Sequence, residues 1–423
     1  MKCADTLYNQ YLKILHEELQ PAMGCTEPIA IAYAAAKVRQ VLGKLPDRIS
    51  VKVSGNIIKN VKSVVIPHTG GLRGIPAAVA VGVVAGDPEG ELEVISRVTE
   101  EQIEVTKQYL KDIPIAVSCA DTPHIFDIQL TAYRGEEEAF VRIVDYHTNI
   151  VCIRKGSRML LEKECACQEA GLTDRTCLSV EGIVEFADCV ELSHVEEVLQ
   201  RQIDYNMAIA EEGLRGNYGA NIGKTILYNG GDDLNYQMRG WAAAASDARM
   251  NGCELPVVIN SGSGNQGITA SVPVIVYARQ TGKTREKLLR ALCVSNLVTI
   301  HLKTDIGRLS AYCGAVSAGV GAGAGLAYLK GGDFRTVAHT VVNAIAIASG
   351  MICDGAKASC AAKIAASVDA GVIGLAMFER GDQFYGGDGI VKKGVENTIA
   401  TVGKLARIGM EQTDKEIIQL MME

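Results

Sequence analysis

Three cysteines have surroundings that suit chemistry better than simple packing. Cys25 lies in PAMGCTEP, Cys313 in LSAYCGAV and Cys353 in GMICDGAKASC, and each has a glycine within two residues. Such small neighbours leave space for a bulky group beside the sulfur atom. Three thiolates can hold three irons of a four-iron cluster and leave the fourth iron open as a Lewis acid. Ligands that lie so far apart in the chain leave no local sequence signature, so the spacing of these cysteines alone does not identify a cluster site.

The chain contains 13 cysteines, and a denser group lies between residues 152 and 189. None of that group has the close C-x-x-C spacing that is typical of structural zinc sites. They are interpreted as small buried hydrophobic side chains. Cys360 lies close to Cys353, and its role stays open. The denser group consists of Cys152, Cys165, Cys167, Cys177 and Cys189.

A glycine-rich loop could bind an anion. GSGNQG at 262–267 matches the dinucleotide fingerprint letter for letter and follows the strand-like LPVVI. That fingerprint also needs a helix inside a βαβ unit, and Pro273 is expected to interrupt any helix that begins at this loop. Exposed backbone N–H groups and polar side chains suit a carboxylate instead, although a plain turn without a ligand uses the same residue types. The candidate donors are Ser261, Gly262, Ser263, Asn265 and Gln266.

The composition narrows the class of protein. A chain of 423 residues favours two domains, and 48% hydrophobic with 22% charged residues is typical of a soluble globular protein. A net charge of −7 without a Lys/Arg cluster excludes a nucleic-acid surface. The charged, amphipathic first 20 residues lack the apolar core of a signal peptide, so we expect a cytoplasmic protein with reduced thiols.

One uncharged stretch, 309–329, has the length of a membrane span. It consists almost entirely of Ala, Gly, Val and Ser, and bulky apolar residues are scarce. A weakly hydrophobic run of this kind fits a buried core helix better than a bilayer, so no membrane association is expected.

The periodicity of apolar residues predicts an α+β fold. A mainly helical, Ala/Gly-rich body carries an inserted small domain of one helix and several antiparallel strands. The alternation in 50–67 predicts a strand pair or a strand and turn, and helices are expected at 5–19, 29–43, 77–86 and 98–112. The expected domains are 1–88, the N-terminal part of the body; 89–185, the insertion; and 186–423, the helical domain.

Four segments together resemble a known family. PAMGCTEPIAIAYAAA, INSGSGNQGI, GRLSAYCGAV and CDGAKASCAAKIA are similar to the L-cysteine desulfidase family, also called UPF0597. That family is related to the alpha-type region of iron–sulfur L-serine dehydratases. The resemblance implies a 4Fe-4S cluster with one open iron site, held by Cys25, Cys313 and Cys353, and no pyridoxal phosphate. It also implies β-elimination of L-cysteine to pyruvate, ammonia and hydrogen sulfide.

The general base for this reaction is left open among Lys303, Lys357, His68 and a hydroxyl or cluster-ligand group. Asn56, Thr69 and the 261–266 loop are expected to bind the carboxylate and ammonium groups of a small amino-acid substrate. We expect a homodimer.

Three alternatives stay open. The nearest is a lyase acting on L-serine or another β-substituted amino acid. The others are a redox-sensing or electron-carrying iron–sulfur protein, which would need four protein ligands, and a cluster-free binding protein.

Overall fold

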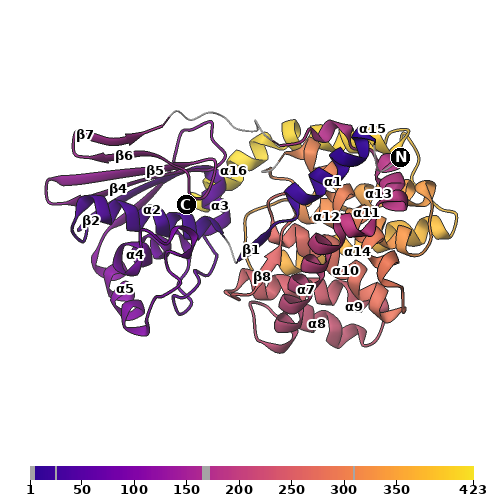
Figure 1. Cartoon of the computed structure of the whole chain (residues 1–423), viewed down its shortest axis with the longest axis horizontal. Helices are drawn as coiled ribbons and strands as arrows, with labels where there is room; N and C mark the ends of the chain where they lie inside the picture. Colours follow the sequence, from indigo (N-terminus) through magenta and orange to yellow (C-terminus); the bar gives the residue numbers. More distant parts are fainter. Residues whose placement is uncertain (1–4, 24–25, 164–171, 308–309) are drawn as a thin grey trace.

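The structure is a computed structural model that describes residues 5–23, 26–163, 172–307 and 310–423. It has two lobes, a sheet lobe and a helical lobe (Figure 1). The expected α+β, mainly helical fold is confirmed.

The sheet lobe contains a six-stranded sheet in the order β3-β2-β4-β5-β6-β7. β2 pairs in parallel with β3, and the remaining neighbours pair antiparallel. Helices α2, α4 and α5 belong to this lobe, and α2 packs on β4, β5 and β6. The strands are β2 (Arg48–Val53), β3 (Ile115–Cys119), β4 (Asp127–Arg134), β5 (Glu137–Val144), β6 (Ile150–Lys155) and β7 (Arg158–Glu162); the helices are α2 (Thr26–Leu42), α4 (Gly74–Ala85) and α5 (Glu100–Asp112).

The expected strand pair at 50–67 is only half right. β2 forms, but the next segment is a helix, α3 (Gly55–Val61). β2 pairs on its two sides with β3 and β4, which lie far along the chain. Both edges of β2 are thus occupied, and the segment after it cannot pair with it. The buried apolar residues Ile57, Ile58 and Val61 instead follow helical spacing.

The hydrophobic cores divide the chain differently from the boundaries expected at residues 89 and 186. The core of the sheet lobe includes residues from Ile29 to Ile150, so α2, β2 and α4 lie in the same lobe as β3–β7. A parallel pairing such as β2–β3 needs a long crossover, which local periodicity does not reveal. The sheet lobe includes residues on both sides of the boundary expected at residue 89. The three-domain division stays a prediction.

The helical lobe is built around α12 (Gly314–Leu329), which packs against α10, α11, α13 and α14. A Cβ on Gly319 would lie 2.3 Å from the carbonyl oxygen of Ser367 in α14, so glycine allows the two backbones to approach. The expectation of a buried core helix here is confirmed. The other helices are α1 (Thr6–Glu18), α6 (Val180–Cys189), α7 (Leu192–Arg215), α8 (Ile222–Gly230), α9 (Leu234–Met250), α10 (Gly264–Gln280), α11 (Arg285–Ile306), α13 (Phe334–Ala348), α14 (Cys360–Glu379) and α15 (Val395–Lys404).

Pro273 does not interrupt the chain as expected, because α10 continues through it. Proline removes one helical hydrogen bond, but α10 is buried among α7, α9, α11 and α12, and this packing holds the helix together. The strand before it, β8 (Pro256–Val258), pairs antiparallel with β1 (Pro21–Met23) in a two-stranded sheet. The loop 262–267 is thus not part of a parallel βαβ unit.

Within the described ranges, one helix is long and apolar enough to cross a membrane, by length and composition alone. It is α14, and half of its most apolar window is buried inside the protein. Because α14 packs against α9, α12 and α13, the same composition fits a core helix.

The last helix, α16 (Glu411–Met422), leaves the helical lobe and packs on α3 of the sheet lobe (Figure 1). Ile418 and Met421 pack against the sheet lobe's core. Lys62 on the turn after α3 donates a hydrogen bond to the carbonyl of Met421. This contact ties the two lobes together next to α3.

Candidate active site

Cys313 and Cys353 lie side by side, although 39 residues separate them, because two short segments pair there. Tyr312 and Ile352 form an antiparallel bridge. The N–H of Cys313 donates to the carbonyl of Met351 at 3.0 Å, and that of Cys353 to the carbonyl of Ala311 at 2.6 Å. The two thiols are hydrogen-bonded to each other.

The two thiols differ in acidity. The hydrogen bond from Cys313 lowers the pKa of Cys353 against the effect of burial, and the positive charges of Lys59 and Lys303 lower it further. The hydrogen bond to Cys353, together with burial, raises the pKa of Cys313. Cys353 is therefore the thiolate of the pair, and a thiolate is the form that binds metal.

Lys303 is buried in the last turn of α11, with only 6% of its surface exposed. Burial lowers the pKa of its ammonium group to about 8, although the nearby Cys353 and Cys313 act in the opposite direction. Lys59 also lowers this pKa. A lysine in this range is partly neutral near physiological pH, as a general base must be.

Lys59, which the sequence did not single out, lies in α3 beside this group. Its side chain is 3% exposed, and its Nζ lies 2.5 Å from Oδ1 of Asp414 in α16. Its carbonyl oxygen lies so close to Gly355 that a Cβ there would be only 1.8 Å away. Gly355 has a φ of +91°, so glycine is needed for both the close approach and the backbone conformation. The loop after Cys353 is thereby pressed against α3.

A cavity of about 390 Å³ is lined by both Lys303 and Ser261, whereas Cys313 and Cys353 are not among its lining residues. Most of the other lining residues have polar side chains, among them Glu18, Thr173 and Arg175. Arg175 is paired with Glu18 at 2.8 Å and with Glu17 at 2.9 Å. The cavity thus joins the predicted loop and one predicted base, and its volume suits a small molecule.

The 260–267 loop is held rigidly at the start of α10. Asn260 is buried and donates to both oxygens of Asn296, at 2.9 and 3.2 Å. Ser261 has a φ of +49°, which is strained for a residue with a side chain. Its hydroxyl donates to Oδ1 of Asn260 at 2.9 Å. Gly262 has a φ of +77°, and Ser263 precedes the first turn of α10 without capping it through its side chain.

Gln266 and Asn265 point to different neighbours. Asn265 accepts hydrogen bonds from Ser246 at 3.4 Å and Arg249 at 3.3 Å, so its oxygen is engaged with α9. Gln266 is buried against Gly314, where a Cβ would lie 2.8 Å from Cδ of Gln266. Its Oε1 atom has no hydrogen-bond partner among the described residues. Gln266 is the member of the loop that lies beside Cys313.

The other candidates from the sequence lie in varied surroundings. Lys357 is ion-paired with Asp354 and does not lie on a helix with Cys353, because α14 begins only at Cys360. His68 is half-buried, with Nδ1 3.2 Å from Oε1 of Glu254.

Asn56 and Thr69 both lie in the sheet lobe, between β2 and α4. Asn56 lies on α3, and its Oδ1 is buried without a partner in the part of the chain that the structure describes. Thr69 is buried and donates to the carbonyl of Ile66 at 2.6 Å. The hydroxyl of Thr69 is thus already used within its own loop.

Cys25, Cys165 and Cys167 lie outside the described residues. Close to Cys25 in the chain, Glu27 accepts a hydrogen bond from Asn60, the neighbour of Lys59, at 3.2 Å. Cys360 lies near Cys353, and its thiol donates to the carbonyl of Gly355 at 3.4 Å.

Cys152, Cys177 and Cys189 lie on β6, in the short turn 175–177 and at the end of α6. Over the ranges that the structure covers, no group of three or more His, Cys, Asp or Glu side chains is arranged to hold a metal ion. The described part of the predicted ligand set is therefore the pair Cys313 and Cys353.

Comparison with known proteins gives the family. Residues 89–419 match the family model for the serine dehydratase alpha chain. A UPF0597 protein of Desulfitobacterium hafniense (strain Y51) is 56% identical over 423 residues, covering 100% of this chain and 98% of the relative. The chain belongs to the UPF0597 family.

Two further UPF0597 proteins extend this finding. That of Treponema denticola is 47% identical and covers 98% of both chains. That of Lachnoclostridium phytofermentans is 48% identical over 98% of this chain and 100% of its own length. The predicted resemblance to UPF0597 and to serine dehydratase alpha chains is confirmed, and this membership indicates a lyase-type enzyme.

Proposed function

We propose that this UPF0597 protein is an iron–sulfur-dependent lyase that eliminates the thiol group of L-cysteine. The observation that supports it most is the position of Lys303, which is buried beside the Cys313–Cys353 pair and lines the cavity that also contains Ser261. Lys303 thus connects a pair of ligand-type thiols with a cavity of small-molecule size.

The chemistry of the thiol pair fits a cluster. Cys353 has a lowered pKa, and Cys313 is in direct contact with it, so both sulfurs are available to neighbouring irons. We assign Cys25, Cys313 and Cys353 as the three ligands, with Cys25 assigned from the sequence alone. When bound, such a cluster supplies an open iron that can accept the departing sulfur, since a soft thiolate suits it.

The residues of the chain supply the proton transfer. Neutral Lys303 takes the α-proton of the substrate, and the β-carbon–sulfur bond breaks as its electron pair leaves with the sulfur. The product, aminoacrylate, becomes the imine and adds water to give pyruvate and ammonia. Sulfur leaves as hydrosulfide, so one cysteine and one water yield pyruvate, ammonia and hydrogen sulfide.

The cavity and loop orient the substrate. Ser261 lines the same cavity as Lys303, and the amide of Gln266 packs against Gly314, the neighbour of Cys313. We assign the Ser261 hydroxyl and the Gln266 amide to the substrate carboxylate. Lys59 holds positive charge beside Cys353 and thereby favours the thiolate.

A second candidate is dehydration of L-serine, and the match to the serine dehydratase alpha chain favours it. Hydroxide is a poorer leaving group than hydrosulfide and needs an acid beside it. Asp354, the carboxyl group nearest to Cys353 in the chain, is kept ionised because Lys357 and Lys363 lower its pKa against the effect of burial. This favours cysteine.

The test uses protein that is purified without oxygen and assayed for iron, sulfide and pyruvate with L-cysteine and L-serine in parallel. We expect sulfide and pyruvate in equal amounts from cysteine and a lower rate of pyruvate formation from serine. Colourless, iron-free protein that forms no pyruvate from either substrate would refute the proposal.

Cysteine variants test the ligand assignment. Cys25→Ala, Cys313→Ala and Cys353→Ala should each lose iron and activity together, because each removes one of three ligands. Cys189→Ala is the matched control and should keep both, as should Cys360→Ala at least in part. We further propose that the enzyme is a cytoplasmic homodimer, which size-exclusion chromatography with light scattering tests.

A further inference from the structure

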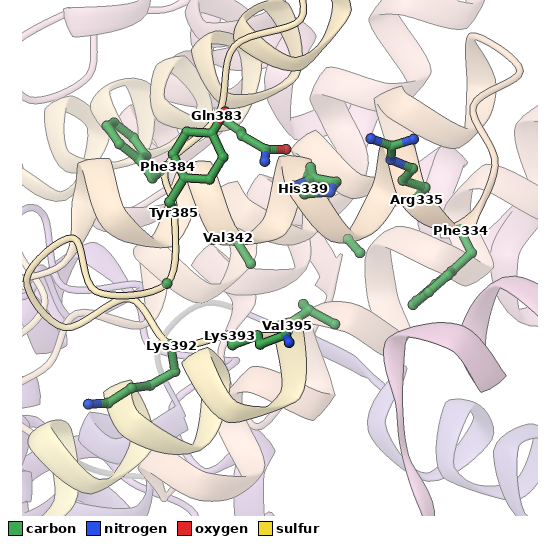
Figure 2. Close-up of a pocket in the computed structure, with 13 residues that line it drawn as sticks. Phe334, Arg335, His339, Val342, Gln383, Phe384, Tyr385, Lys392, Lys393 and Val395 are labelled. Atoms are coloured by element: carbon green, nitrogen blue, oxygen red, sulfur yellow. The ribbon is translucent and has the colours of Figure 1, made fainter.

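A second cavity, of about 360 Å³, lies in the helical lobe and shares no lining residue with the cavity beside Lys303. It is formed by one side of α13, the loop 383–386 and the start of α15. Figure 2 shows Arg335, His339 and Val342 along α13, with Val342 directed toward Lys393 and Val395 across the space. Nothing in the proposed reaction uses these residues.

The lining of the cavity contains three cations. Arg335, Lys392 and Lys393 line it, and no aspartate or glutamate is among its described lining residues. The carboxylates closest to the lining residues in sequence are Asp333, Asp382, Asp388 and Glu396. Hydrogen bonds from Thr336 and, to a smaller extent, the charge of Arg335 lower the pKa of Asp333, while Glu396 is paired with His301 at 2.6 Å. Asp333 accepts from Thr336 at 2.9 Å, and Asp388 accepts from Tyr385 at 2.6 Å. In a chain of net charge −7, such a group of cations favours an anionic ligand.

The walls of the cavity are aromatic and apolar. Phe334, Phe384, Val342 and Val395 line it, beside the hydrogen-bonding groups of Gln383 and His339. The His339 ring is stacked on Phe378, with centroids 4.6 Å apart. Burial and, after it, the charge of Arg335 lower the pKa of His339. An apolar wall with a few polar groups is the usual composition of a small-molecule site.

Hydrogen bonds fix the three segments in place. The N–H of Phe384 donates to Oδ1 of Asn343 on α13 at 3.0 Å, which fastens the loop to the helix. The N–H of Lys392 donates to Thr398 on α15 at 3.1 Å. The side chains that line the cavity therefore extend from a fixed frame, and little ordering is needed on binding.

We propose that this cavity is a second ligand site, which binds a small anion with a flat aromatic or heterocyclic body. The body packs between Phe334, Phe384 and Val342, and Arg335 with Lys393 binds the anionic group. Arginine donates to such oxygens in pairs, which adds specificity to charge.

The test measures binding of 1-naphthalenesulfonate to the full-length protein by equilibrium dialysis, with the uncharged 1-naphthalenesulfonamide as matched ligand. Arg335→Gln combined with Lys393→Gln should raise the Kd of the sulfonate roughly tenfold, since each lost charge-assisted hydrogen bond weakens binding substantially. Lys404→Gln is the matched control, because it removes an exposed cation at the end of α15 that does not line the cavity. It should change the Kd less than twofold.

Ala338→Trp fills the cavity from α13 and should abolish binding of the sulfonate. Equal binding of the sulfonamide and the sulfonate would overturn the proposal, as would an unchanged Kd in the double variant. So would the absence of binding at millimolar sulfonate. These measurements need neither iron nor activity, so their outcome is independent of the proposed reaction.

Discussion

Replacing Lys303 with methionine should make the protein more stable and inactive at the same time. Methionine has a similar length and carries no charge, so it keeps the packing of α11 and removes the buried ammonium group. Burial lowers the pKa of Lys303 from 10.5 to about 8. At about 1.36 kcal/mol per pKa unit, this shift corresponds to a cost of about 3 kcal/mol for the buried cation.

This cost depends on pH in a defined direction. Below pH 8 the lysine is protonated in both the folded and the unfolded chain, and the folded state bears the full cost. As the pH rises from 8 to 10.5, the folded protein releases the proton first, and the cost disappears. The free energy of unfolding of the variant should therefore exceed that of the parent by up to about 3 kcal/mol at pH 7. This difference should shrink toward pH 10.

The assay is anaerobic urea denaturation of the iron-free protein, followed by circular dichroism, beside a pyruvate assay of the iron-loaded protein. Lys287→Met, an exposed lysine on the same helix, is the control and should change stability by less than about 0.5 kcal/mol. A Lys303→Met protein that is less stable than the parent at pH 7 would refute the electrostatic reasoning. One that keeps the parent's kcat would remove Lys303 as the base.

Three other changes test the surroundings. Asp414→Asn leaves the buried Lys59 without its carboxylate and should cost roughly 2–3 kcal/mol in urea denaturation, whereas Glu411→Gln in the exposed pair with Lys415 should cost under about 0.5 kcal/mol. Burial raises the pKa of Asp247 from 3.8 to about 6, so the ionised carboxylate destabilises the fold above pH 6. The Asp247→Asn variant should therefore be more stable than the parent by up to about 3 kcal/mol at pH 8. This difference should disappear toward pH 4. Gln266→Leu should raise the KM for cysteine about tenfold or more with iron content unchanged, while Asn265→Ala, whose side chain faces α9, should raise it less; equal effects would contradict this assignment.

The sequence predicted best those elements that depend on neighbouring residues. Helices α1, α2, α4 and α5 agree with the ranges predicted from periodicity, because each repeats one apolar face over several turns. α3 and the continuous helix through Pro273 were not predicted, since both are decided by packing partners far along the chain.

The candidate site divides along the same line. Glycine-flanked cysteines signalled Cys313 and Cys353, and the structure brings these two together, while the assignment of a cluster stays a prediction. Only one weak signal pointed to Lys59: it follows two isoleucines and lies two residues before Val61, among residues that are buried. Lysine is rarely buried unless it is paired. The position of Lys59 beside Cys353 depends on α16 and the Gly355 loop, and no local pattern contains those contacts.

The contact between α16 and α3 also has a consequence for the order of events during synthesis. The ribosome releases the sheet lobe's strands early, but Ile418 and Met421, which pack against that lobe's core, emerge only after the whole helical lobe. Domains usually mature as they leave the ribosome, N-terminal part first. Here the sheet lobe keeps part of its apolar surface exposed until α16 has been synthesised. A nascent chain should therefore depend on chaperones up to that point. For the same reason Lys59 cannot pair with Asp414 until α16 has been synthesised, so a chain that stops before residue 411 would lack this pairing.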